Sequence, residues 1–438
     1  MIVIGAGVAG LAAARTLSAS RVKVLIVEAR SRIGGRILTV RDPDLHLPVE
    51  LGAEFIHGRP GGLVQVAQAA GSELDEVSRK QWYSQGGKLS EADQICPKVD
   101  QIFNRMVDPN LPDQTFSDFL RRTGGDRQAM RWATGYVEGF NAAPADSISV
   151  RSLAHEMLAS EQIDGDRSFR IKDGYDRIPQ WLWQECKSHS ATLHLETVAE
   201  TVEWRCGRVE VAARSSREDA PLVFSADRAI ITVPLGVLQV PDGAPGAIRF
   251  DPELPDMRAA LDRLGMGQAM RITLIFRASL REHQPLFSEA GFIHSADEFF
   301  PTWWTGLPAR TPVVTGWAGG PPAQRLANLS DSRLVECAIE SLARALDMTC
   351  EVLRSRLASW YVHNWSTDPF ARGAYSYACV GGLEARRKLA TPIKSTLYFA
   401  GEATNWEGFS ATVHGALASG ERAAQEILES SPAARSPQ

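Results

Sequence analysis

The first 36 residues constrain the fold of this chain more than any other stretch. A short apolar run at residues 2–4 stops at a glycine cluster of the form Gly-x-Gly-x-x-Gly, made of Gly5, Gly7 and Gly10. An alanine-rich segment follows, and a second apolar run ends in an acidic residue, Glu28. A strand, a glycine turn, a helix and an acid-ended strand together form a βαβ unit with a dinucleotide-binding fingerprint.

Each position of the fingerprint has a physical role. Gly5 allows the tight turn, Gly7 lets the backbone approach a pyrophosphate, and Gly10 lets the helix pack closely on the sheet. We expect the diphosphate on the free N–H groups at the helix N-terminus, where the dipole favours negative charge. Glu28 has the place of the acid that binds a ribose hydroxyl. A glycine turn without a ligand is the alternative, and the flanking strands and helix argue against it.

Composition excludes several classes of partner. The 438 residues, 44% of them hydrophobic and 23% charged, suffice for two domains or one large interleaved domain. A net charge of −5 gives no indication of a nucleic acid or an anionic membrane as partner. No apolar run is long enough to span a membrane. The six cysteines are scattered without zinc-ligand spacing, so we expect no metal site and a reducing, cytoplasmic location.

Hydrophobic periodicity predicts the order of the elements. Helices are expected at residues 62–70, 95–106, 115–122, 127–138, 150–160 and 330–348. Strands are expected at residues 192–195, 198–204, 209–213, 223–233 and 270–276. A strand at 396–402 and a helix at 412–428 would complete, at the far end of the chain, the sheet that begins at residue 2.

These patterns predict an α/β fold of mixed α+β content, with a substrate domain inserted in two pieces into a Rossmann-like nucleotide domain. The discontinuous nucleotide domain is expected to comprise residues 1–74, 186–250 and 371–430. The substrate domain, a mixed sheet with a helical insert, is expected to comprise residues 75–185 and 251–370. Residues 431–438 read as a flexible tail.

Five motifs, in order along the chain, carry a resemblance to a known family. They are the fingerprint with Gly34-Gly35-Arg36, then Glu50-Leu-Gly-Ala53, Thr232-Val-Pro-Leu-Gly-Val-Leu238, Ala371-Arg-Gly-Ala-Tyr-Ser-Tyr377, and Phe399-Ala-Gly-Glu402 with Ala411-Thr-Val-His-Gly-Ala416. From Ile2 to about Ile427 the chain resembles the flavin-containing amine oxidases: monoamine oxidases, polyamine oxidases and flavin-type histone lysine demethylases. The resemblance implies oxidation of a primary or secondary amine, possibly a polyamine, by hydride transfer to the N5 atom of FAD. Water would hydrolyse the imine to an aldehyde, and O₂ would re-oxidise the flavin to give H₂O₂.

The resemblance also implies the cofactor contacts. The matching positions are Gly5, Gly7, Ala9, Gly10, Glu28, Arg30, Gly35, Arg36, Ala53, Glu54, Phe55, Ala199, Glu402, Thr412 and Val413. Gly5, Ala9 and Gly10 would face the diphosphate, Ala199 would meet the adenine, and Glu402 would lie at the ribityl-diphosphate. Thr412 and Val413 would begin a helix that points at the flavin pyrimidine. A helix N-terminus there would stabilise the anionic reduced flavin.

Aromatic residues are implied for the substrate site. Tyr375 matches one wall of the family's aromatic cage, and the other wall is Thr412, as in the demethylases. Trp365 matches a tryptophan of the demethylase and polyamine branches. Aromatic rings attract a cation, and a site without water lowers the pKa of the amine, which gives the neutral amine that hydride loss requires. Plain packing in the core is the alternative for both aromatic residues.

Three positions bear on how the flavin is attached and on which groups would face it or the substrate. Ala374 stands where monoamine oxidases have the cysteine that attaches flavin, so we expect non-covalent FAD. Arg271 stands where the resemblance implies a lysine linked by water to flavin N5. An arginine could hold that water but cannot act as a neutral base, and an arginine that serves only in a salt bridge is the alternative. His57 resembles the histidine that faces the substrate amine in animal polyamine oxidases, with a loop histidine bonded to backbone as the alternative.

Three other functions stay open at this point. One is a flavin amine dehydrogenase that uses an acceptor other than oxygen, which the arginine at position 271 favours. Another is an L-amino-acid oxidase, although no arginine for a substrate carboxylate can be assigned from the sequence. The third is a flavin-binding interaction protein without turnover, against which the intact motifs argue.

Overall fold

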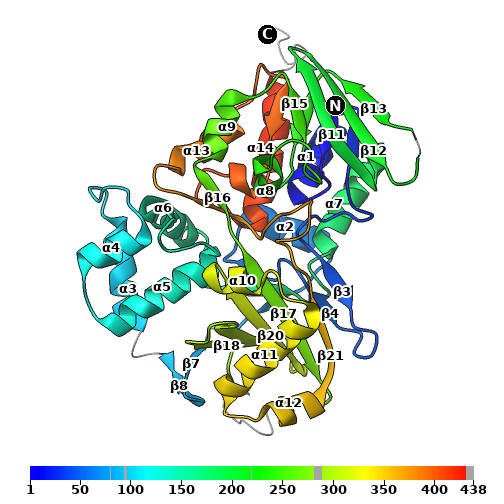
Figure 1. Cartoon of the computed structure of the whole chain (residues 1–438). Helices are drawn as coiled ribbons and strands as arrows, with labels where there is room; N and C mark the ends of the chain where they lie inside the picture. The colour runs from blue at the N-terminus through cyan, green and yellow to red at the C-terminus, as the bar shows by residue number, and fades with distance from the viewer. Residues whose placement is uncertain (79, 93–95, 219, 281–288, 431–438) are drawn as a thin grey trace.

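The computed structural model describes residues 1–78, 80–92, 96–218, 220–280 and 289–430. Two lobes lie one above the other in Figure 1, with a group of helices beside them, and the N-terminus lies in the upper lobe. The tail expected at 431–438 and the start of the helix expected at 95 lie outside the described residues. No helix in the described ranges is both long and apolar enough to cross a membrane.

The upper lobe is organised around a five-stranded parallel sheet. Its order is β10-β2-β1-β14-β23, with β10 Thr192–His194, β2 Leu25–Val27, β1 Ile2–Ile4, β14 Ala229–Ile231 and β23 Leu397–Phe399. The central strand β1 is buried throughout, as expected for a parallel sheet covered on both faces. The sheet brings together strands from both ends of the chain, which confirms the expected Rossmann-like arrangement.

Helices from distant parts of the sequence share one core beneath this sheet. They are α1 (Val8–Ala19), α2 (Gly61–Ala69), α7 (Arg177–Ser188) and α14 (Val413–Glu429). In Figure 1 the blue α1 lies next to the red α14. Helices α1 and α14 lie in close contact because Gly420 of α14 has no side chain. A Cβ added at Gly420 would lie 2.1 Å from the Ala9 carbonyl oxygen.

A second core fills the other face of the parallel sheet. A four-stranded sheet of order β13-β12-β11-β15 packs there with three short helices. Their bounds are β11 Thr197–Arg205, β12 Arg208–Ser215, β13 Leu222–Ala226, β15 Arg249–Asp251, α8 Leu235–Gln239, α9 Pro255–Leu261 and α13 Leu383–Ala390. The single strand expected at 223–233 is wrong: it is β13 and β14, which belong to different sheets.

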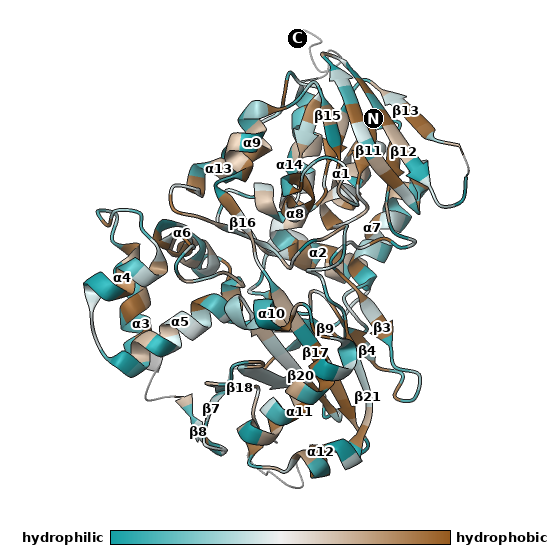
Figure 2. Cartoon of the chain, in the orientation of Figure 1, coloured by the Kyte–Doolittle hydropathy of each residue, from teal (hydrophilic) through white to brown (hydrophobic). Residues whose placement is uncertain are grey.

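The lower lobe contains a seven-stranded sheet of order β21-β17-β20-β19-β18-β7-β8. The strands are β7 Gln81–Gln85, β8 Lys88–Glu91, β17 Ala269–Phe276, β18 Phe292–Ser295, β19 Thr302–Thr305, β20 Val313–Gly319 and β21 Leu357–Val362. Helices α10 (Pro321–Leu326), α11 (Asp331–Leu346) and α12 (Cys350–Arg356) accompany it. Figure 2 shows both hydrophilic and hydrophobic residues on α11, whose apolar face packs in the core of this lobe.

The helical insert has a core of its own. It comprises α3 (Cys96–Asn104), the 3-10 turn η2 (Arg105–Val107), α4 (Phe116–Thr123), α5 (Arg127–Asn141) and α6 (Val150–Glu161). Three of these helices begin at the expected type of N-cap, because the side chains of Thr115, Asp126 and Ser149 accept hydrogen bonds from the first turn. The insert contributes one face of α5 and one of α6 to the site described below.

Short strands form three smaller sheets. They form the pairs β3 (Thr39–Arg41) with β4 (Pro48–Glu50) and β16 (Leu264–Met266) with β22 (Ser376–Ala378), and the sheet of β5 (Ile56–His57), β9 (Ser168–Ile171) and β6 (Leu74–Glu76). The 3-10 turn η5 comprises Glu402–Thr404.

The structure differs from the sequence-based expectations in one hairpin and at two domain limits. Strands β7 and β8 lie where no strand was expected, and they form a hairpin at Gly86-Gly87, both with positive φ. Helix α7 belongs to the core of α1 although it begins before residue 186, and residues 254–264 pack on the nucleotide sheet although they follow residue 250. Periodicity predicts that a helix forms but not which core receives its apolar face, so these limits do not follow the packing.

Candidate active site

One cavity of about 2450 Å³ extends from the fingerprint to the interface of the two lobes. Pockets for small molecules usually measure about 300–1,000 Å³, so this cavity has room for a dinucleotide and a second molecule. It brings together every residue predicted for the site except Gly10. Gly10 packs under the turn, where an added Cβ would lie 2.0 Å from the Gly5 carbonyl oxygen, and its expected contact with the diphosphate stays a prediction.

The fingerprint end of the cavity fits a diphosphate. Helix α1 begins after Gly7 without a side-chain cap, which leaves its first N–H groups for a ligand. Gly5 has a φ of 106°, and an added Cβ at Gly35 would lie 3.3 Å from the Gly7 Cα. The two glycine loops therefore leave space that side chains would fill. Glu28 accepts hydrogen bonds from the N–H groups of Ala6 (2.7 Å) and Arg30 (2.9 Å), and it lines the cavity.

Two arginines predicted for the cofactor are held by carboxylates. Arg30 donates to both oxygens of Asp368 at 2.9 Å. Arg36 Nη1 donates to the Ala374 carbonyl oxygen at 2.7 Å and to Glu402 Oε1 at 2.9 Å. These pairs fix both guanidinium groups at the cavity wall. Ala374 also lines the cavity, and its methyl group offers no nucleophile to a flavin.

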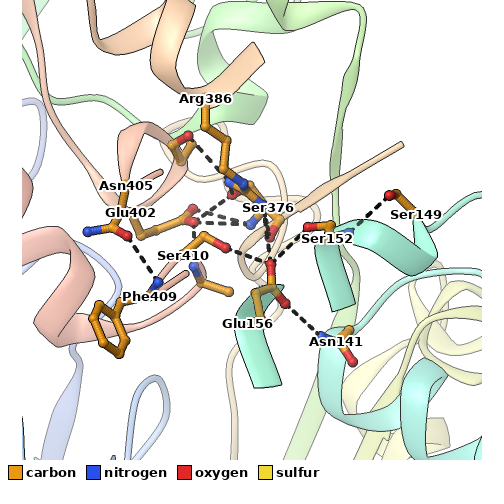
Figure 3. Close-up of polar contacts among 12 residues, drawn as sticks. Asn141, Ser149, Ser152, Glu156, Ser376, Arg386, Glu402, Asn405, Phe409 and Ser410 are labelled. Carbon is orange, nitrogen blue, oxygen red and sulfur yellow. Dashed lines mark hydrogen bonds and ion pairs between the residues drawn. The ribbon is translucent and has the colours of Figure 1, made fainter. Parts of the chain in front are cut away.

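Glu402 is the centre of a buried polar network, drawn in Figure 3. Its Oε2 accepts hydrogen bonds from the Ser376 hydroxyl (2.6 Å) and the Ala411 N–H (3.0 Å). Burial favours a higher pKa for Glu402, but Arg36 and Arg386 hold its pKa below the ordinary value. The carboxylate is therefore charged, and it anchors the chain immediately before α14.

Helix α14 begins at the cavity wall. The Thr412 hydroxyl donates to the Phe409 carbonyl oxygen at 2.7 Å and accepts from the Gly415 N–H at 2.9 Å, so it is an N-cap. Thr412 and Val413 both line the cavity, which places the positive end of a 17-residue helix there. The Thr412 side chain thus has a capping function that the comparison with an aromatic wall did not predict.

Arg271 is held in a buried ion pair. Its Nη2 lies 2.6 Å from Glu54 Oε2, and its Nη1 donates to the Gly52 carbonyl oxygen at 3.2 Å. Glu54 also pairs with Arg170 at 2.5 Å and accepts from Trp304 Nε1 at 3.1 Å. Burial favours a higher pKa for Glu54, but Arg271 and Arg170 hold its pKa below the ordinary value.

The structure thus contains the salt bridge that was the alternative role for Arg271. Its Nε is buried without a hydrogen-bond partner among the described residues. Arg271 lines the cavity, so its positive charge lies at the cavity wall. Glu54, predicted as a cofactor contact, fixes the arginine as well.

An aromatic chamber closes the cavity between the lobes; it is lined by Phe55, His57, Phe140, Trp304, Trp317 and Tyr375. The ring centroids of His57 and Phe140 are 5.4 Å apart, and those of Phe55 and Trp304 are 5.6 Å apart. The Tyr375 hydroxyl donates to the Phe140 carbonyl oxygen at 2.7 Å. Burial raises the pKa of Tyr375, so the phenol stays neutral. Phe55 is therefore part of the chamber, and its place beside the flavin stays a prediction.

His57 belongs to this chamber as a neutral imidazole. Burial lowers its pKa to about 4. Its Nδ1 lies 3.1 Å from the Ser168 hydroxyl, so its partner is a side chain and not the backbone. Trp365 is packed more tightly: it is 5% exposed, and its Nε1 donates to the Leu51 carbonyl oxygen at 2.8 Å. Trp365 touches the cavity next to Gly52, away from the chamber's ring contacts.

Sequence reasoning missed one face of α5. Trp132, Tyr136 and Phe140 recur every four residues and line the cavity. Tyr136 and Phe140 stack with centroids 5.4 Å apart and planes at 9°. The spacing of four on one helix was the available signal. Trp317 was not predicted for the site either; its Nε1 donates to the Gly139 carbonyl oxygen at 2.8 Å, which ties α5 to β20.

Comparison with known proteins agrees with this geometry. The model of the family described as "Flavin containing amine oxidoreductase" matches residues 8–428, so the chain belongs to that family. It is an FAD-dependent amine oxidoreductase. This result argues against a flavin-binding protein without turnover.

Individual relatives are moderately similar. "Polyamine oxidase 4" of Oryza sativa subsp. japonica is 29% identical over 97% of this chain and 88% of its own length. "Lysine-specific histone demethylase 1 homolog 1" of the same organism is 28% identical over 98% of this chain and 52% of its own length. Among solved structures, wild-type putrescine oxidase bound to putrescine has a TM-score of 0.81 at 21% identity, with 98% of both chains covered. Cyclohexylamine oxidase from Brevibacterium oxydans IH-35A has a TM-score of 0.79 at 20% identity, also with 98% of both chains covered.

Proposed function

We propose that this enzyme oxidises a primary or secondary amine and passes the electrons to oxygen, giving an imine, its aldehyde and H₂O₂. The observation that carries the proposal is the aromatic chamber with its neutral histidine, at the end of a cavity that begins with a dinucleotide fingerprint. Bound FAD supplies the acceptor for the hydride that leaves the carbon next to nitrogen. The names of the similar proteins, polyamine oxidase among them, support an amine as substrate.

The chamber prepares the amine for hydride loss. Aromatic walls attract a cationic amine, and exclusion of water then lowers its pKa toward the neutral form. Ser168 engages Nδ1 of His57, and Nε2 has no hydrogen-bond partner among the described residues. Nε2 is therefore the ring nitrogen that can bind the substrate amine. Because the imidazole is neutral, it does not repel the ammonium form on entry.

Arg271 supplies a fixed positive charge beside the chamber. Its ion pair with Glu54 prevents it from moving, and a guanidinium does not give up its proton at physiological pH. The guanidinium charge at the cavity wall can stabilise negative charge that develops on the cofactor. Arg271 therefore acts as an electrostatic group and not as a base.

A peroxide assay over monoamines, diamines, polyamines and L-amino acids tests this function. Amines should give peroxide, and they should bleach the flavin when oxygen is absent. Absence of bleaching by every amine would refute amine oxidation. Bleaching followed by slow recovery in air would favour the dehydrogenase, which the ion-paired Arg271 keeps as the second candidate. Arg30, Arg36 and Arg271 are each paired with a carboxylate, which argues against an amino-acid carboxylate as their ligand. The cytoplasmic location stays a prediction.

A further inference from the structure

Carboxylates that line the cavity in the described part of the chain fall into three groups. Arginines or backbone N–H groups hold Glu28, Glu54, Asp297 and Glu402. Several others are exposed to solvent: Asp100, Glu161, Asp164, Asp166, Glu298 and Asp347. Two half-buried carboxylates remain, Glu138 and Glu156. Glu138 accepts a hydrogen bond from the Ala145 N–H at 3.3 Å and is influenced by Arg325.

Glu156 differs in how its two oxygens are used (Figure 3). Oε1 accepts hydrogen bonds from the hydroxyls of Ser410 (2.9 Å) and Ser152 (3.2 Å), and Arg386 Nη2 lies 3.9 Å away. Among the described residues, Oε2 accepts only from Asn141 Nδ2, at the long distance of 3.4 Å. The protein therefore saturates Oε1 and leaves Oε2 able to accept from a donor in the cavity.

The neighbours of Glu156 place it close to the aromatic chamber. Ser410 lies two residues before Thr412, the N-cap of α14. Asn141 directly follows Phe140, whose carbonyl accepts the Tyr375 hydroxyl. The Glu156 carboxylate thus lies between the start of α14 and the end of α5, and both line the same cavity. Burial raises the pKa of Glu156 despite Arg386, so the protein compensates its charge only in part.

The reacting nitrogen is not the partner that suits this carboxylate. A carboxylate beside that nitrogen would stabilise its ammonium form, whereas hydride loss needs the neutral amine. A carboxylate in the same cavity suits a second nitrogen that stays cationic. We propose that Glu156 binds a second, cationic nitrogen of the substrate and so makes the cavity selective for diamines over monoamines of equal length. The proposal rests on the amine oxidation proposed above and adds the residue that selects the substrate.

Matched pairs of amines test this selectivity on the holoenzyme. Each diamine is compared with the monoamine that has a methyl group in place of the second nitrogen: butane-1,4-diamine with pentan-1-amine, and hexane-1,6-diamine with heptan-1-amine. The rate of flavin bleaching without oxygen is followed against amine concentration. The wild type should bind at least one diamine more tightly than its monoamine. Glu156→Gln should weaken the binding of that diamine about ten- to a hundredfold, as expected for loss of a charged hydrogen bond. The binding of the monoamine should not change.

Glu138→Gln is the matched control, since it removes the other half-buried carboxylate from the same cavity wall. It should keep the diamine preference. Equal effects of Glu156→Gln on both members of a pair would make Glu156 a structural link between α6 and Ser410 and overturn the proposal. A wild type without diamine preference would overturn it as well, while amine oxidation would stand. If no amine bleaches the flavin, amine oxidation fails and this proposal fails with it.

Glu156→Asp keeps the charge and provides an independent test if the glutamine variant loses FAD. It withdraws the carboxylate by one methylene group. The variant should therefore prefer a longer diamine. The ratio of the affinity for hexane-1,6-diamine to the affinity for butane-1,4-diamine should rise. An unchanged ratio would contradict a direct contact between Glu156 and the second nitrogen.

Discussion

Glu54 is paired with two arginines beside the aromatic chamber, so its replacement should lower the stability of the protein. The side chains of Glu54, Arg271 and Arg170 are 9%, 7% and 15% exposed. Glu54→Gln keeps the shape but leaves two guanidinium groups without their counter-charge. Removing one partner of a buried ion pair costs about 3–5 kcal/mol, so the free energy of unfolding should fall by about that amount.

Urea unfolding of the FAD-loaded protein, followed by tryptophan fluorescence, measures this loss. The double variant Glu54→Gln with Arg271→Met should be more stable than Glu54→Gln alone, because one uncompensated cation is gone. Glu73→Gln is the matched control: its partner Lys172 and Glu73 are both exposed, so stability should not change measurably. If the Glu54 variant matched this control, or if the double variant were no more stable, the ion pair would not be the source of the effect.

The pH dependence follows from the sign of the shift. The folded-state pKa of Glu54 lies below the ordinary value of 4.5. Its contribution to stability is therefore fully present above that value and is lost as the pH falls through the lower, folded-state pKa. The difference in stability between wild type and Glu54→Gln should stay constant at neutral pH and shrink in acid. A difference that shrinks above pH 5 would contradict the low pKa.

Three further outcomes are expected. Acid precipitation should release all FAD into solution, because Ala374 offers no nucleophile; flavin retained in the pellet would show a covalent link elsewhere. Arg271→Met should slow re-oxidation of the flavin by oxygen more than its reduction by amine, because the variant loses a fixed positive charge at the cavity; stopped-flow traces of the two half-reactions separate the effects. Burial lowers the pKa of His57 to about 4, so its protonation should not appear in the pH dependence of kcat/KM above about pH 5. A histidine ionisation near pH 6.5 that disappears in His57→Gln would contradict the buried, neutral imidazole.

Much of the fold could be read from local patterns. The turn at Gly5, the acid at Glu28 and the helix after Thr412 each depend on a few neighbouring residues, and the structure has them where they were expected. The hairpin of β7 and β8 was missed because its short, polar strands gain their burial only from the sheet they join. The break between β13 and β14 was missed for a similar reason. Two adjacent apolar runs predict one strand, and only the tertiary structure shows that they belong to different sheets.

The candidate site shows the same division between sequence and tertiary structure. By itself the sequence determined the dinucleotide fingerprint, the family motifs and the non-reactive Ala374, since these depend on residue type and spacing. Only the tertiary structure decided what the side chains do. It pairs Arg271 with a glutamate 217 positions earlier in the chain at 2.6 Å, and it brings Glu156 to Ser410 across 254 positions. Ion pairs, burial and shared cavities arise from contacts between distant segments, and their energies depend on the dielectric surroundings that folding creates.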